Sequence, residues 1–576
     1  MERIWLKNYD PAVPHSMNYP QITLQQLLEK TARRFPDRTA IIFPGVLGDS
    51  YRITFQQLNE QVNRLANALT SLGVKKGDRV TLLMPNCPQF VISYYAVLKV
   101  GGIVVATNPL YSPREMEHQF KDCGTETIIL LSLFYRTVAE LKDKTGLKNL
   151  IVTNIKEYLP PVTRTLFTLL REKKEGHRVD ISGIPNIYSF QDLLHKFGDT
   201  SPNVEVSTDD IAMLQYTGGT TGLSKGAVAL HRNVVANVCQ MRSWETPLGL
   251  NEGKEVIMGV MPLFHVYGMV TVMLFAVATG STMVLLPRWD TTQVLKAIAR
   301  YKPAFFPGVP TMYVAINNHP EVKKYDLRSI ESCSSGAAPL PLEVQQKFEE
   351  LTGGKLLEGY GLSEAPVVVT SNPLMGVRKT GGIGVPFPDV EAKLMDAETG
   401  DKEMPLGEVG ELVIRGPQVM KGYWNRPEET EKVLRNGWLY TGDMAKMDED
   451  GYIFIVDRKK DMIIAGGFNI YPREIEEVLF EHPKIQEAVC YGLPHEYRGQ
   501  TVKVCIVLKE GESCTPEEIT EFCQSRLAKY KMPKHIEFRE SLPKSLIGKV
   551  LRRVLVEEEM TKLKERQKEQ REGKIG

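Results

Sequence analysis

The sequence predicts an α/β protein with more than one domain, and three features of the chain support this prediction. Short, continuously apolar runs such as Ile103–Ala106 and Met283–Leu286 alternate with helical stretches, which is typical of parallel sheets covered by helices on both faces. After Gly381 the apolar runs become shorter and alternate with polar residues, which favours a β-rich subdomain. The chain has 576 residues, more than a single hydrophobic core usually supports.

We therefore expect a large N-terminal domain, residues 1–456, that combines two doubly covered, mostly parallel sheets with a small β-rich subdomain. The two sheets are expected from roughly residues 50–200 and 205–350. A run of five charged residues, 457–461, lies between two apolar strands and is interpreted as the link to a small α+β domain, residues 462–576.

One uncharged stretch, Met269–Leu286, reaches the minimum length of a membrane span, about 18 residues. Gly280 and the polar residues beside it interrupt this stretch. We therefore expect a buried helix over Val270–Ala278 and a strand over Met283–Leu286. The same order of helix, glycine and strand occurs at Ser93–Ala106.

The C-terminal domain has clear signals of its own. Pro472 is expected to open a helix, and strands are expected at Gln486–Tyr491 and Val502–Leu508. Thr515 and Glu518 fit a capping box at the start of a further helix. The final stretch from Glu557 is rich in Glu, Lys, Arg and Gln, so either a frayed helix or a disordered tail is expected.

The composition argues against several classes of protein. Lys and Arg number 71 against 70 Asp and Glu, and the formal net charge of +1 argues against a protein that binds nucleic acid through a general basic field. The eight cysteines are scattered without a Cys-x-x-Cys pair, which fits neither a zinc site nor a disulfide framework. The amino terminus lacks an apolar stretch long enough for a secretory signal. We therefore expect a cytoplasmic protein.

The segment from Tyr216 to Gly226, YTGGTTGLSKG, says most about chemistry. Its four glycines let backbone N–H groups approach a polyanion, while three threonine hydroxyls and one lysine can contact phosphate oxygens. In the nucleotide loop G-x-x-x-x-G-K-[ST] lysine directly follows glycine, whereas here Ser224 precedes Lys225 and Gly226 follows it. This order favours an enzyme that attacks the α-phosphate of ATP and expels pyrophosphate over a GTPase-like or kinase-like protein.

Further motifs follow the loop in a fixed order and span most of the chain. They are Pro262–Gly268 (PLFHVYG), Gly336–Leu340 (GAAPL), Tyr360–Glu364 (YGLSE), Tyr440–Asp443 (YTGD), Asp457–Asp461 (DRKKD) and Pro543–Lys549 (PKSLIGK). With the loop, this set resembles the adenylate-forming enzymes, the superfamily of acyl-CoA synthetases, luciferases and peptide-synthetase adenylation domains. The sequence at Pro85–Pro88, Thr107–Tyr111 and Lys421–Trp424 is most similar to that of bacterial long-chain fatty acid–CoA ligases.

The resemblance implies an enzyme that joins a fatty acid to AMP with release of pyrophosphate and then transfers the acyl group to coenzyme A with release of AMP. It implies ATP, Mg²⁺ and coenzyme A as cofactor and co-substrates, and no nucleic acid partner is expected. Alternatives among enzymes are an aryl- or medium-chain acyl-CoA ligase and a stand-alone adenylating enzyme that loads a carrier protein. A non-catalytic protein that responds to ATP is the alternative from another class.

A fatty acid is already ionised near neutral pH, so the first step requires charge screening and alignment rather than a general base. The resemblance implies Mg²⁺ at Thr217 and Glu364, and one carboxylate suits this ion because phosphate oxygens complete its shell. Ser224 stands where family members often carry proline, and no phosphate ligand is lost by the change. The phosphates themselves are expected at the loop residues Gly218, Gly219, Thr220, Thr221, Gly222 and Lys225.

Four further motifs are implied to hold the nucleoside. The adenine would lie against the small residues Gly336, Ala337 and Ala338 and the face of Tyr360, which precedes Gly361. Asp443 and Arg458 would contact the ribose hydroxyls. Without the resemblance, the first group is an ordinary turn beside a core tyrosine and the second a pair of surface ion-pair members.

The resemblance makes Lys549 the catalytic lysine, which bridges the carboxylate and the α-phosphate, and puts His265 beside the acyl carboxylate. Whether His265 transfers protons or only positions the substrate is left open. Family members rotate the small, mobile domain about a hinge residue, here Lys460, between the two steps. The rotation would withdraw Lys549 and bring Gly466 and Gly467 to the pantetheine tunnel. Without the resemblance, Lys549 is interpreted as a solvated side chain, His265 as a core residue, and Gly466 and Gly467 as an ordinary turn.

Residues 158–174 contain an amphipathic segment in which Val162, Leu166, Leu169 and Leu170 share one face of a helix, with basic residues beside and after them. This segment would either lie on an anionic membrane at its inner face and collect fatty acid, or dock on its own domain. The amphipathic period is compatible with both alternatives, and docking on its own domain is the favoured one. A homodimer is also considered, although the sequence holds no argument about the oligomeric state.

Overall fold

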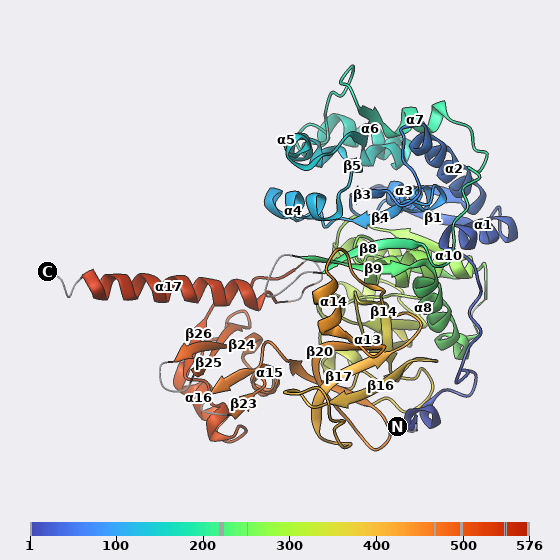
Figure 1. The fold of residues 1–576 in the computed structure, drawn as a ribbon. Coiled ribbons are helices and arrows are strands. Elements are labelled where there is room, and N and C mark those ends of the chain that lie inside the picture. Colours follow the sequence, from blue (N-terminus) through green and yellow to red (C-terminus); the bar gives the residue numbers. More distant parts are fainter. Residues whose placement is uncertain are drawn as a thin grey trace. The chain divides into compact units, whose positions relative to one another are not determined.

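The computed structural model describes residues 3–217, 224–249, 251–465, 468–495, 499–545, 548 and 550–572. The side chains of residues 468, 469 and 563–572 lie outside that description. The chain divides into two compact units (Figure 1). The larger unit comprises Trp5–Glu391 and Arg415–Leu439, and the smaller unit comprises Met1–Ile4, Ala392–Ile414 and Tyr440–Gly576.

The larger unit contains an eight-stranded sheet in the order β18-β9-β8-β4-β3-β5-β6-β7. Strands from β8 to β7 run parallel, whereas β9 and β18 are antiparallel at one edge. In chain order the strands are β3 (Arg79–Leu83), β4 (Ile103–Ala106), β5 (Thr127–Leu131), β6 (Asn149–Thr153), β7 (Ile187–Ser189), β8 (Ile211–Thr217), β9 (Lys225–Leu230) and β18 (Gly422–Tyr423). Every residue of β4 and β5 is buried, as expected for parallel strands covered on both faces.

Helices of the larger unit surround this sheet. α4 and α5 cover one face through Phe120 and Val138, while α3 is buried at every residue and contacts β3 and β4. α4 begins with a capping box at Ser112 and ends at Gly124, whose φ of 63° is a conformation that favours glycine. In chain order, the α-helices up to residue 244 are α1 (Leu24–Arg34), α2 (Phe55–Ser71), α3 (Pro88–Lys99), α4 (Pro113–Cys123), α5 (Tyr135–Thr145), α6 (Pro161–Leu170), α7 (Phe190–Lys196) and α8 (His231–Trp244).

A second sheet has two four-stranded parts, β10-β11-β1-β2 and β12-β13-β14-β15, and parallel bridges through Phe305 link Ile257 of one part with Ser332 of the other. The strands β10, β11 and β1 are parallel, as are β12 and β13. The bounds are β1 (Thr39–Pro44), β2 (Ser50–Thr54), β10 (Val256–Gly259), β11 (Thr282–Leu285), β12 (Ser332–Ser335), β13 (Lys355–Leu362), β14 (Ala365–Ser371) and β15 (Val385–Pro386). The later helices are α9 (Val266–Gly268), a π-helix (Met269–Leu274), α10 (Phe275–Thr279), α11 (Thr291–Tyr301), α12 (Pro310–Asn317), α13 (Leu342–Thr352) and α14 (Pro427–Val433).

The division of the chain between the sheets differs from the expected one. We expected residues 50–200 and 205–350 to build one sheet each, but β8 and β9 join the first sheet, and β2 joins the second together with β1, which precedes the expected ranges. β8 pairs with β4 through Met213 and Leu214, and β1 pairs with β11 through Ile41 and Ile42. An apolar run identifies a strand but not its neighbour, which explains the difference.

The stretch Met269–Leu286 forms the expected buried helix and strand, since α10 ends at Gly280 with a φ of 68° and β11 follows. No helix within the described part of the chain combines the length and apolar character that a membrane crossing requires.

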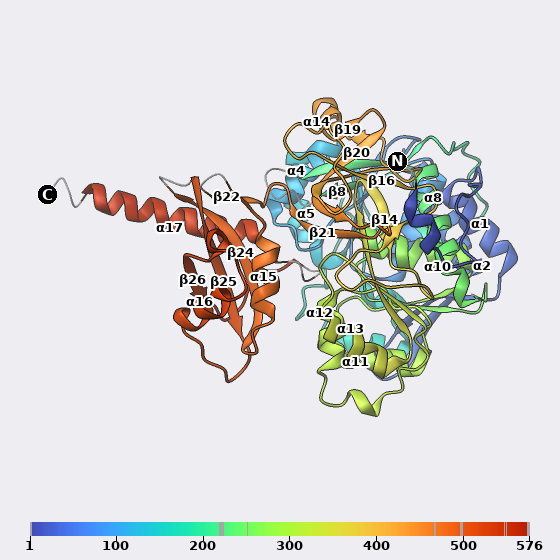
Figure 2. The ribbon, with the colours of Figure 1, turned by 90° about the horizontal axis from the view of Figure 1, so that it is seen from below.

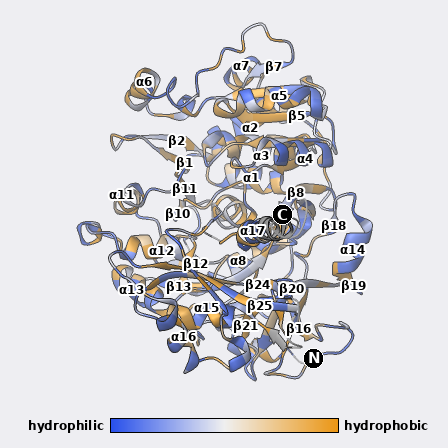
Figure 3. Cartoon of the chain, turned by 90° about the vertical axis from the view of Figure 1, so that its left-hand side faces the viewer, coloured by the Kyte–Doolittle hydropathy of each residue, from blue (hydrophilic) through white to orange (hydrophobic). Residues whose placement is uncertain are grey.

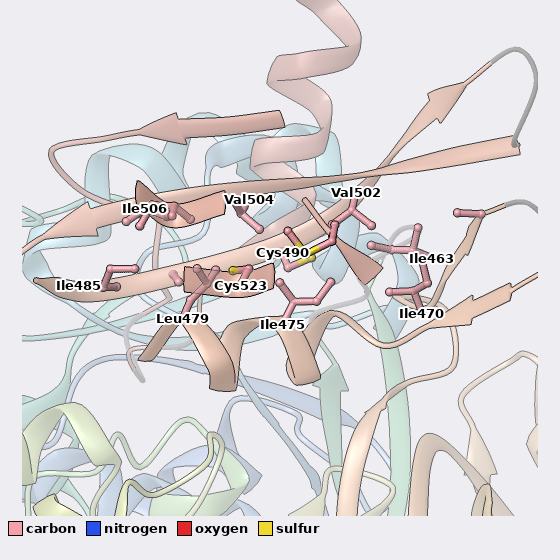
Figure 4. Close-up of a cluster of buried hydrophobic side chains, with 14 residues drawn as sticks. Ile463, Ile470, Ile475, Leu479, Ile485, Cys490, Val502, Val504, Ile506 and Cys523 are labelled. Carbon is pink, nitrogen blue, oxygen red and sulfur yellow. The ribbon is translucent and has the colours of Figure 1, made fainter. Parts of the chain in front are cut away.

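The smaller unit contains a sheet in the order β23-β22-β25-β24, with β26 paired to β25 (Figure 2). Alternate residues of β24 and β25 face opposite sides. Val504 and Cys490 pack with Ile475 of α15 and Cys523 of α16 (Figure 4), whereas Val489 packs with Leu542 and Leu555 on the other side. The bounds are β22 (Ile463–Ala465), β23 (Phe468–Ile470), α15 (Pro472–Phe480), β24 (Ile485–His495), β25 (Gly499–Leu508), α16 (Pro516–Gln524), β26 (His535–Phe538) and α17 (Arg552–Glu572).

Several local predictions for this unit are confirmed. α15 begins at Pro472, and Thr515 forms the expected capping box with Glu518 at the start of α16. Beyond Glu557 the helix α17 continues to Glu572, which is one of the two alternatives expected.

A further sheet has the order β16-β17-β20-β19 with β21 beside β20, and its strands are β16 (Glu391–Met395), β17 (Val409–Arg415), β19 (Leu434–Arg435), β20 (Trp438–Met447) and β21 (Ile453–Arg458).

The predicted link at 457–461 does not coincide with the division into units. Ala392–Ile414 and residues 440–456 group with the residues that follow the link. The division into domains at 457–461 stays a prediction, because it concerns movement rather than packing.

Candidate functional site

The phosphate-loop motif lies at the end of an antiparallel pair of strands. Thr217 ends β8 and Lys225 begins β9, and the two residues are partners in the strand register. The hydroxyl of Thr217 donates a hydrogen bond to the carbonyl of Lys225 over 3.5 Å. Gly218, Gly219, Thr220, Thr221 and Gly222 lie outside the described residues. The described ends of the loop therefore bring the predicted metal ligand Thr217 next to the predicted phosphate ligand Lys225.

Lys225 is engaged by the segment that contains β18 and α14. Its ammonium group forms an ion pair with Glu429 of α14 and lies 5.4 Å from the centre of the Tyr423 ring. Glu429 also accepts a hydrogen bond from Lys432 over 2.7 Å. Hydrogen bonds from Lys225 and then Lys432 lower the pKa of Glu429 to about 2. Sequence reasoning missed Glu429, because nothing in its local pattern separates it from a solvated helix residue.

Glu364 lies in the tight turn between β13 and β14 and is the predicted carboxylate ligand of Mg²⁺. One oxygen accepts a hydrogen bond from the hydroxyl of Tyr423 over 2.7 Å, and its backbone carbonyl accepts one from Met420. Burial and then the charge of Glu364 raise the pKa of the Tyr423 phenol above its usual value. Tyr423 thus connects Lys225 with Glu364. No role was predicted for Tyr423 from the sequence, although it belongs to the motif Lys421–Trp424.

The residues present fit a magnesium ion chemically. Glu364 supplies one half-buried carboxylate, and its Oε2 atom accepts no hydrogen bond from the described residues. Thr217 supplies a neutral hydroxyl oxygen. Mg²⁺ prefers one or two carboxylates together with phosphate oxygens and water, so this small set of ligands suits an ion that arrives with a nucleotide.

His265 is held at the start of α9 close to the end of β8. Its Nδ1 atom accepts a hydrogen bond from the backbone N–H of Tyr267 over 3.2 Å, so the ring caps the helix. The carbonyl of the preceding residue, Phe264, accepts a hydrogen bond from Gln215 of β8 over 3.4 Å. His265 is half-buried and therefore matches neither a solvated side chain nor a fully enclosed core residue.

The adenine motif meets the histidine motif through Tyr267. The hydroxyl of Tyr267 donates to the carbonyl of Ser334 over 2.7 Å, and a Cβ atom placed on Gly336 would lie 3.6 Å from the Tyr267 ring. Ala337 has a φ of 67°, an uncommon conformation for a residue with a side chain, and Ala338 follows it in the same bend. The structure thus brings two motifs together that are separated by about 70 residues in the sequence.

Tyr360 and Gly361 lie on β13, next to β12 and its continuation into Gly336. Tyr360 is half-buried and pairs in register with Thr370 of β14. A Cβ atom on Gly361 would lie 1.4 Å from the carbonyl oxygen of Val367, so only glycine fits at this position.

Asparagine 86, which the sequence analysis did not single out, fixes the loop before His265. Asn86 is 3% exposed and donates to the carbonyls of Gly259 and Met261 over 3.1 and 2.9 Å. Its own side-chain carbonyl accepts from the N–H of Leu263 over 2.7 Å. The quoted motif Pro85–Pro88 carried the only signal, and it did not reveal a partner.

In the smaller unit, Asp443 and Arg458 contact each other. They are register partners on β20 and β21, and the Nε atom of Arg458 lies 2.9 Å from Oδ1 of Asp443. Asp443 is 3% exposed, which differs from the surface position expected without the resemblance. Their predicted contact with ribose stays a prediction.

The predicted hinge lies beside a cluster of charges. Lys460 is exposed in the turn after β21, between Asp457 and Asp461. Arg552 at the start of α17 lies 3.3 Å from Asp457 and 3.2 Å from Asp461, and it forms two hydrogen bonds of 2.7 and 2.8 Å with Glu476. Gly466, Gly467 and Lys549 lie outside the described residues.

Comparison with known proteins identifies the family. The family model described as AMP-binding enzyme matches residues 28–424, and the model described as AMP-binding enzyme C-terminal domain matches residues 474–549. The first match covers more than half of the chain. The chain therefore belongs to the AMP-binding enzyme family, as the motifs had indicated.

Individual relatives match over nearly the whole chain. A long-chain-fatty-acid–CoA ligase of Bacillus subtilis (strain 168) is 48% identical over 561 residues, which are 97% of this chain and 98% of the relative. A long-chain-fatty-acid–CoA ligase of Escherichia coli O6:H1 is 40% identical over 562 residues, 97% of this chain and 98% of the relative. A probable 4-coumarate–CoA ligase 1 of Dictyostelium discoideum is 33% identical over 93% of this chain and 95% of the relative.

Solved structures confirm the α/β fold. ATP-bound MatB from Rhodopseudomonas palustris has a TM-score of 0.80 at 28% identity and covers 93% of this chain and 99% of its own. The anthranilate CoA ligase AuaEII in complex with anthranoyl-AMP has a TM-score of 0.81 at 28% identity, and covers 93% of this chain and 96% of its own.

We predict that Arg552 is required for the stability of the smaller unit. Burial raises the pKa of both Glu476 and Asp457, and the charge of Arg552 opposes that effect. The substitution Arg552→Leu leaves these carboxylates without their cation, which typically costs about 3–5 kcal/mol. Arg553→Leu is the matched control, because Arg553 is 45% exposed and forms its ion pair with the exposed Glu557 of the same helix. Urea denaturation of both variants measures the difference, and equal midpoints would contradict the prediction.

Proposed function

We propose that the chain is a long-chain fatty acid–CoA ligase that forms an acyl-adenylate from fatty acid and ATP and then an acyl-CoA. The observation that carries this proposal is the chain of contacts from Lys225 through Tyr423 to Glu364, which connects a cation for phosphates with a carboxylate for a metal. Family membership and the substrates named for the bacterial relatives support the same conclusion.

In the proposed first step, the residues of the larger unit align two anions. Lys225 contacts the leaving phosphates and screens their charge, so that the fatty acid carboxylate can approach the α-phosphate. Thr217 and Glu364 would hold Mg²⁺, which neutralises phosphate charge when bound. His265 positions the acyl carboxylate. Its Nδ1 atom accepts a hydrogen bond from the backbone N–H of Tyr267, so its Nε2 atom is the ring nitrogen proposed to contact the substrate.

In the proposed second step, the thiol of coenzyme A attacks the acyl-adenylate carbonyl and AMP leaves with the bonding electrons. Lys549 serves the first step, whereas Gly467 lines the path of the thiol in the second. Lys460, exposed between two carboxylates that Arg552 contacts, is the hinge of this exchange.

The experiment that tests this function measures exchange of labelled pyrophosphate into ATP with acids of graded chain length, followed by addition of coenzyme A. We expect exchange that rises towards long-chain acids, and AMP together with acyl-CoA after coenzyme A is added. Aryl acids giving the faster exchange would favour the aryl-CoA ligase. Release of ADP or orthophosphate without acyl-AMP would contradict the proposal.

Two substitutions separate the half-reactions. We expect Lys549→Ala to lower pyrophosphate release by about 10²–10³-fold, because one preorganised contact to the reacting charge is lost, while thioester formation from supplied acyl-adenylate continues. We expect Gly467→Leu to do the opposite, since a side chain would obstruct the thiol. Loss of both steps in the first variant, or an unchanged thioester yield in the second, would contradict this division of roles.

Contact with a membrane belongs to the same proposal. In α6 the residues of the predicted apolar face are exposed: Val162 by 58%, Leu166 by 37%, Leu169 by 75% and Leu170 by 68%. The helix docks instead through Thr163 and Phe167, which are buried. The helix therefore docks on its own domain, which was the favoured alternative, but it does so through Thr163 and Phe167 and leaves the predicted apolar face exposed.

The exposed face extends onto a neighbouring turn. The hydroxyl of Thr163 donates to Asp49 in the β1–β2 turn over 3.0 Å, and Figure 3 shows α6 close to β2. The same turn contains Val46 and Leu47, which are both exposed. Arg164, Arg171, Lys173 and Lys174 are exposed along or just after the helix. Apolar side chains with basic neighbours fit the interface of an anionic bilayer, and we propose such a bilayer as the partner of this surface.

Vesicle binding tests this partner. We expect the protein to sediment with vesicles that contain phosphatidylglycerol, and the double substitution Leu169→Glu, Leu170→Glu to weaken that binding about tenfold or more, because apolar burial is lost and negative charge is added. Leu342→Glu is the control, since Leu342 is an exposed residue of α13. Unchanged binding would contradict the proposal. A change in oligomeric state of the double variant would instead assign the face to a homodimer.

A further inference from the structure

The segment from β18 to α14, residues 422–433, lies beside the predicted phosphate ligand Lys225, although about 200 residues separate them in the sequence. β18 pairs with β9, with Tyr423 opposite Ala227, and the N–H of Trp424 donates to the carbonyl of Gly226 over 2.8 Å. These bonds hold the segment beside the first residues of β9, so that Glu429 of α14 can form its ion pair with Lys225.

The position of α14 does not depend on that ion pair. Arg426, directly before the helix, forms an ion pair with Asp122, whose side chain is only 7% exposed and also accepts a hydrogen bond from Tyr216 over 2.7 Å. Thr430 accepts from the N–H of Tyr423 over 2.9 Å. The helix therefore remains in place when the charge of Glu429 is removed, which makes a substitution at Glu429 a clean test.

Glu429 offers Lys225 what a phosphate would offer. Its carboxylate is an anion with oxygen acceptors, and it occupies the ammonium group that the proposed function assigns to the leaving phosphates. Hydrogen bonds from Lys225 and Lys432 keep the pKa of Glu429 low, at about 2, so its carboxylate is ionised near neutral pH. A nucleotide must either displace this carboxylate or bind next to a like charge, and both lower its affinity.

We propose that Glu429 is an internal competitor for the phosphates of ATP, which sets a weaker affinity for ATP and speeds the departure of pyrophosphate. This inference rests on the proposed function, because it assumes that Lys225 contacts the phosphates. It adds a residue that tunes substrate affinity from outside the motifs of the family. The opposite role is a second carboxylate for Mg²⁺, in which case Glu429 would strengthen nucleotide binding.

The test compares Glu429→Gln with Glu428→Gln in the full-length protein. Glu428 is exposed on the same turn of α14 and is the matched control. Titration calorimetry with pyrophosphate, with and without Mg²⁺, should give a Kd that is about two- to fivefold lower for Glu429→Gln, the range expected for release of a partly exposed ion pair, and unchanged for Glu428→Gln. The KM for ATP should fall by the same factor, while the KM for the fatty acid stays constant.

Two further measurements secure the interpretation. In a Lys225→Gln background, Glu429→Gln should no longer tighten pyrophosphate binding, because the pair is already broken. The difference between wild type and Glu429→Gln should also shrink as salt is added, since exposed ion pairs are screened. Equal or weaker binding by Glu429→Gln would overturn the proposal. Failure of the proposed function is a separate outcome, in which the wild type itself exchanges no pyrophosphate into ATP.

Discussion

One buried amide joins the two sheets of the larger unit, and the candidate site depends on that junction. Asn86 follows β3, and its partners are Gly259, the last residue of β10, and Met261 and Leu263 just after that strand. Ligands of α/β proteins bind outside the carboxyl ends of the strands, and these bonds tie two such ends together. Without them the carbonyl of Met261 and the N–H of Leu263 would lose their hydrogen bonds to Asn86, at a cost of about 1–3 kcal/mol each, whereas the carbonyl of Gly259 also accepts from the N–H of Leu286 over 3.0 Å. The path of the chain to His265 is fixed by the same bonds.

The class of fold and many of its elements could be predicted from the sequence because they depend on local patterns. Pro472 and the pair Thr515–Glu518 mark the starts of helices, and Gly280 marks the end of one, through the backbone conformation or hydrogen bond that they supply. The partners of the strands could not be predicted in this way. β8 joins a different sheet from the one expected, and β1, which lies before the expected ranges, pairs with β11, since pairing depends on residues that are more than a hundred positions away.

The candidate site divides along the same line. The motifs YGLSE and PLFHVYG predicted Glu364 and His265 as site residues. Tyr423, which contacts Glu364, and Asn86, which fixes the loop before His265, belonged to motifs that resemble the family but had no predicted role. Glu429 carried no signal at all, because a glutamate on a short, polar helix has no distinctive pattern. The apolar face of α6 was recognised from its period, whereas its exposure depends on how little of the helix the domain can accommodate.

The position of β1 decides how this chain can be recombined with its relatives. β1 lies between β2 and β11, although more than two hundred residues separate β1 from β11 in the sequence. A hybrid enzyme that takes its first sixty residues from one parent and the rest from another would therefore insert a foreign strand into the middle of a sheet. Breakpoints that keep residues 39–44, 50–54 and 256–285 from the same parent preserve that junction, and they leave the β1–β2 turn, residues 45–49, free to carry a different surface.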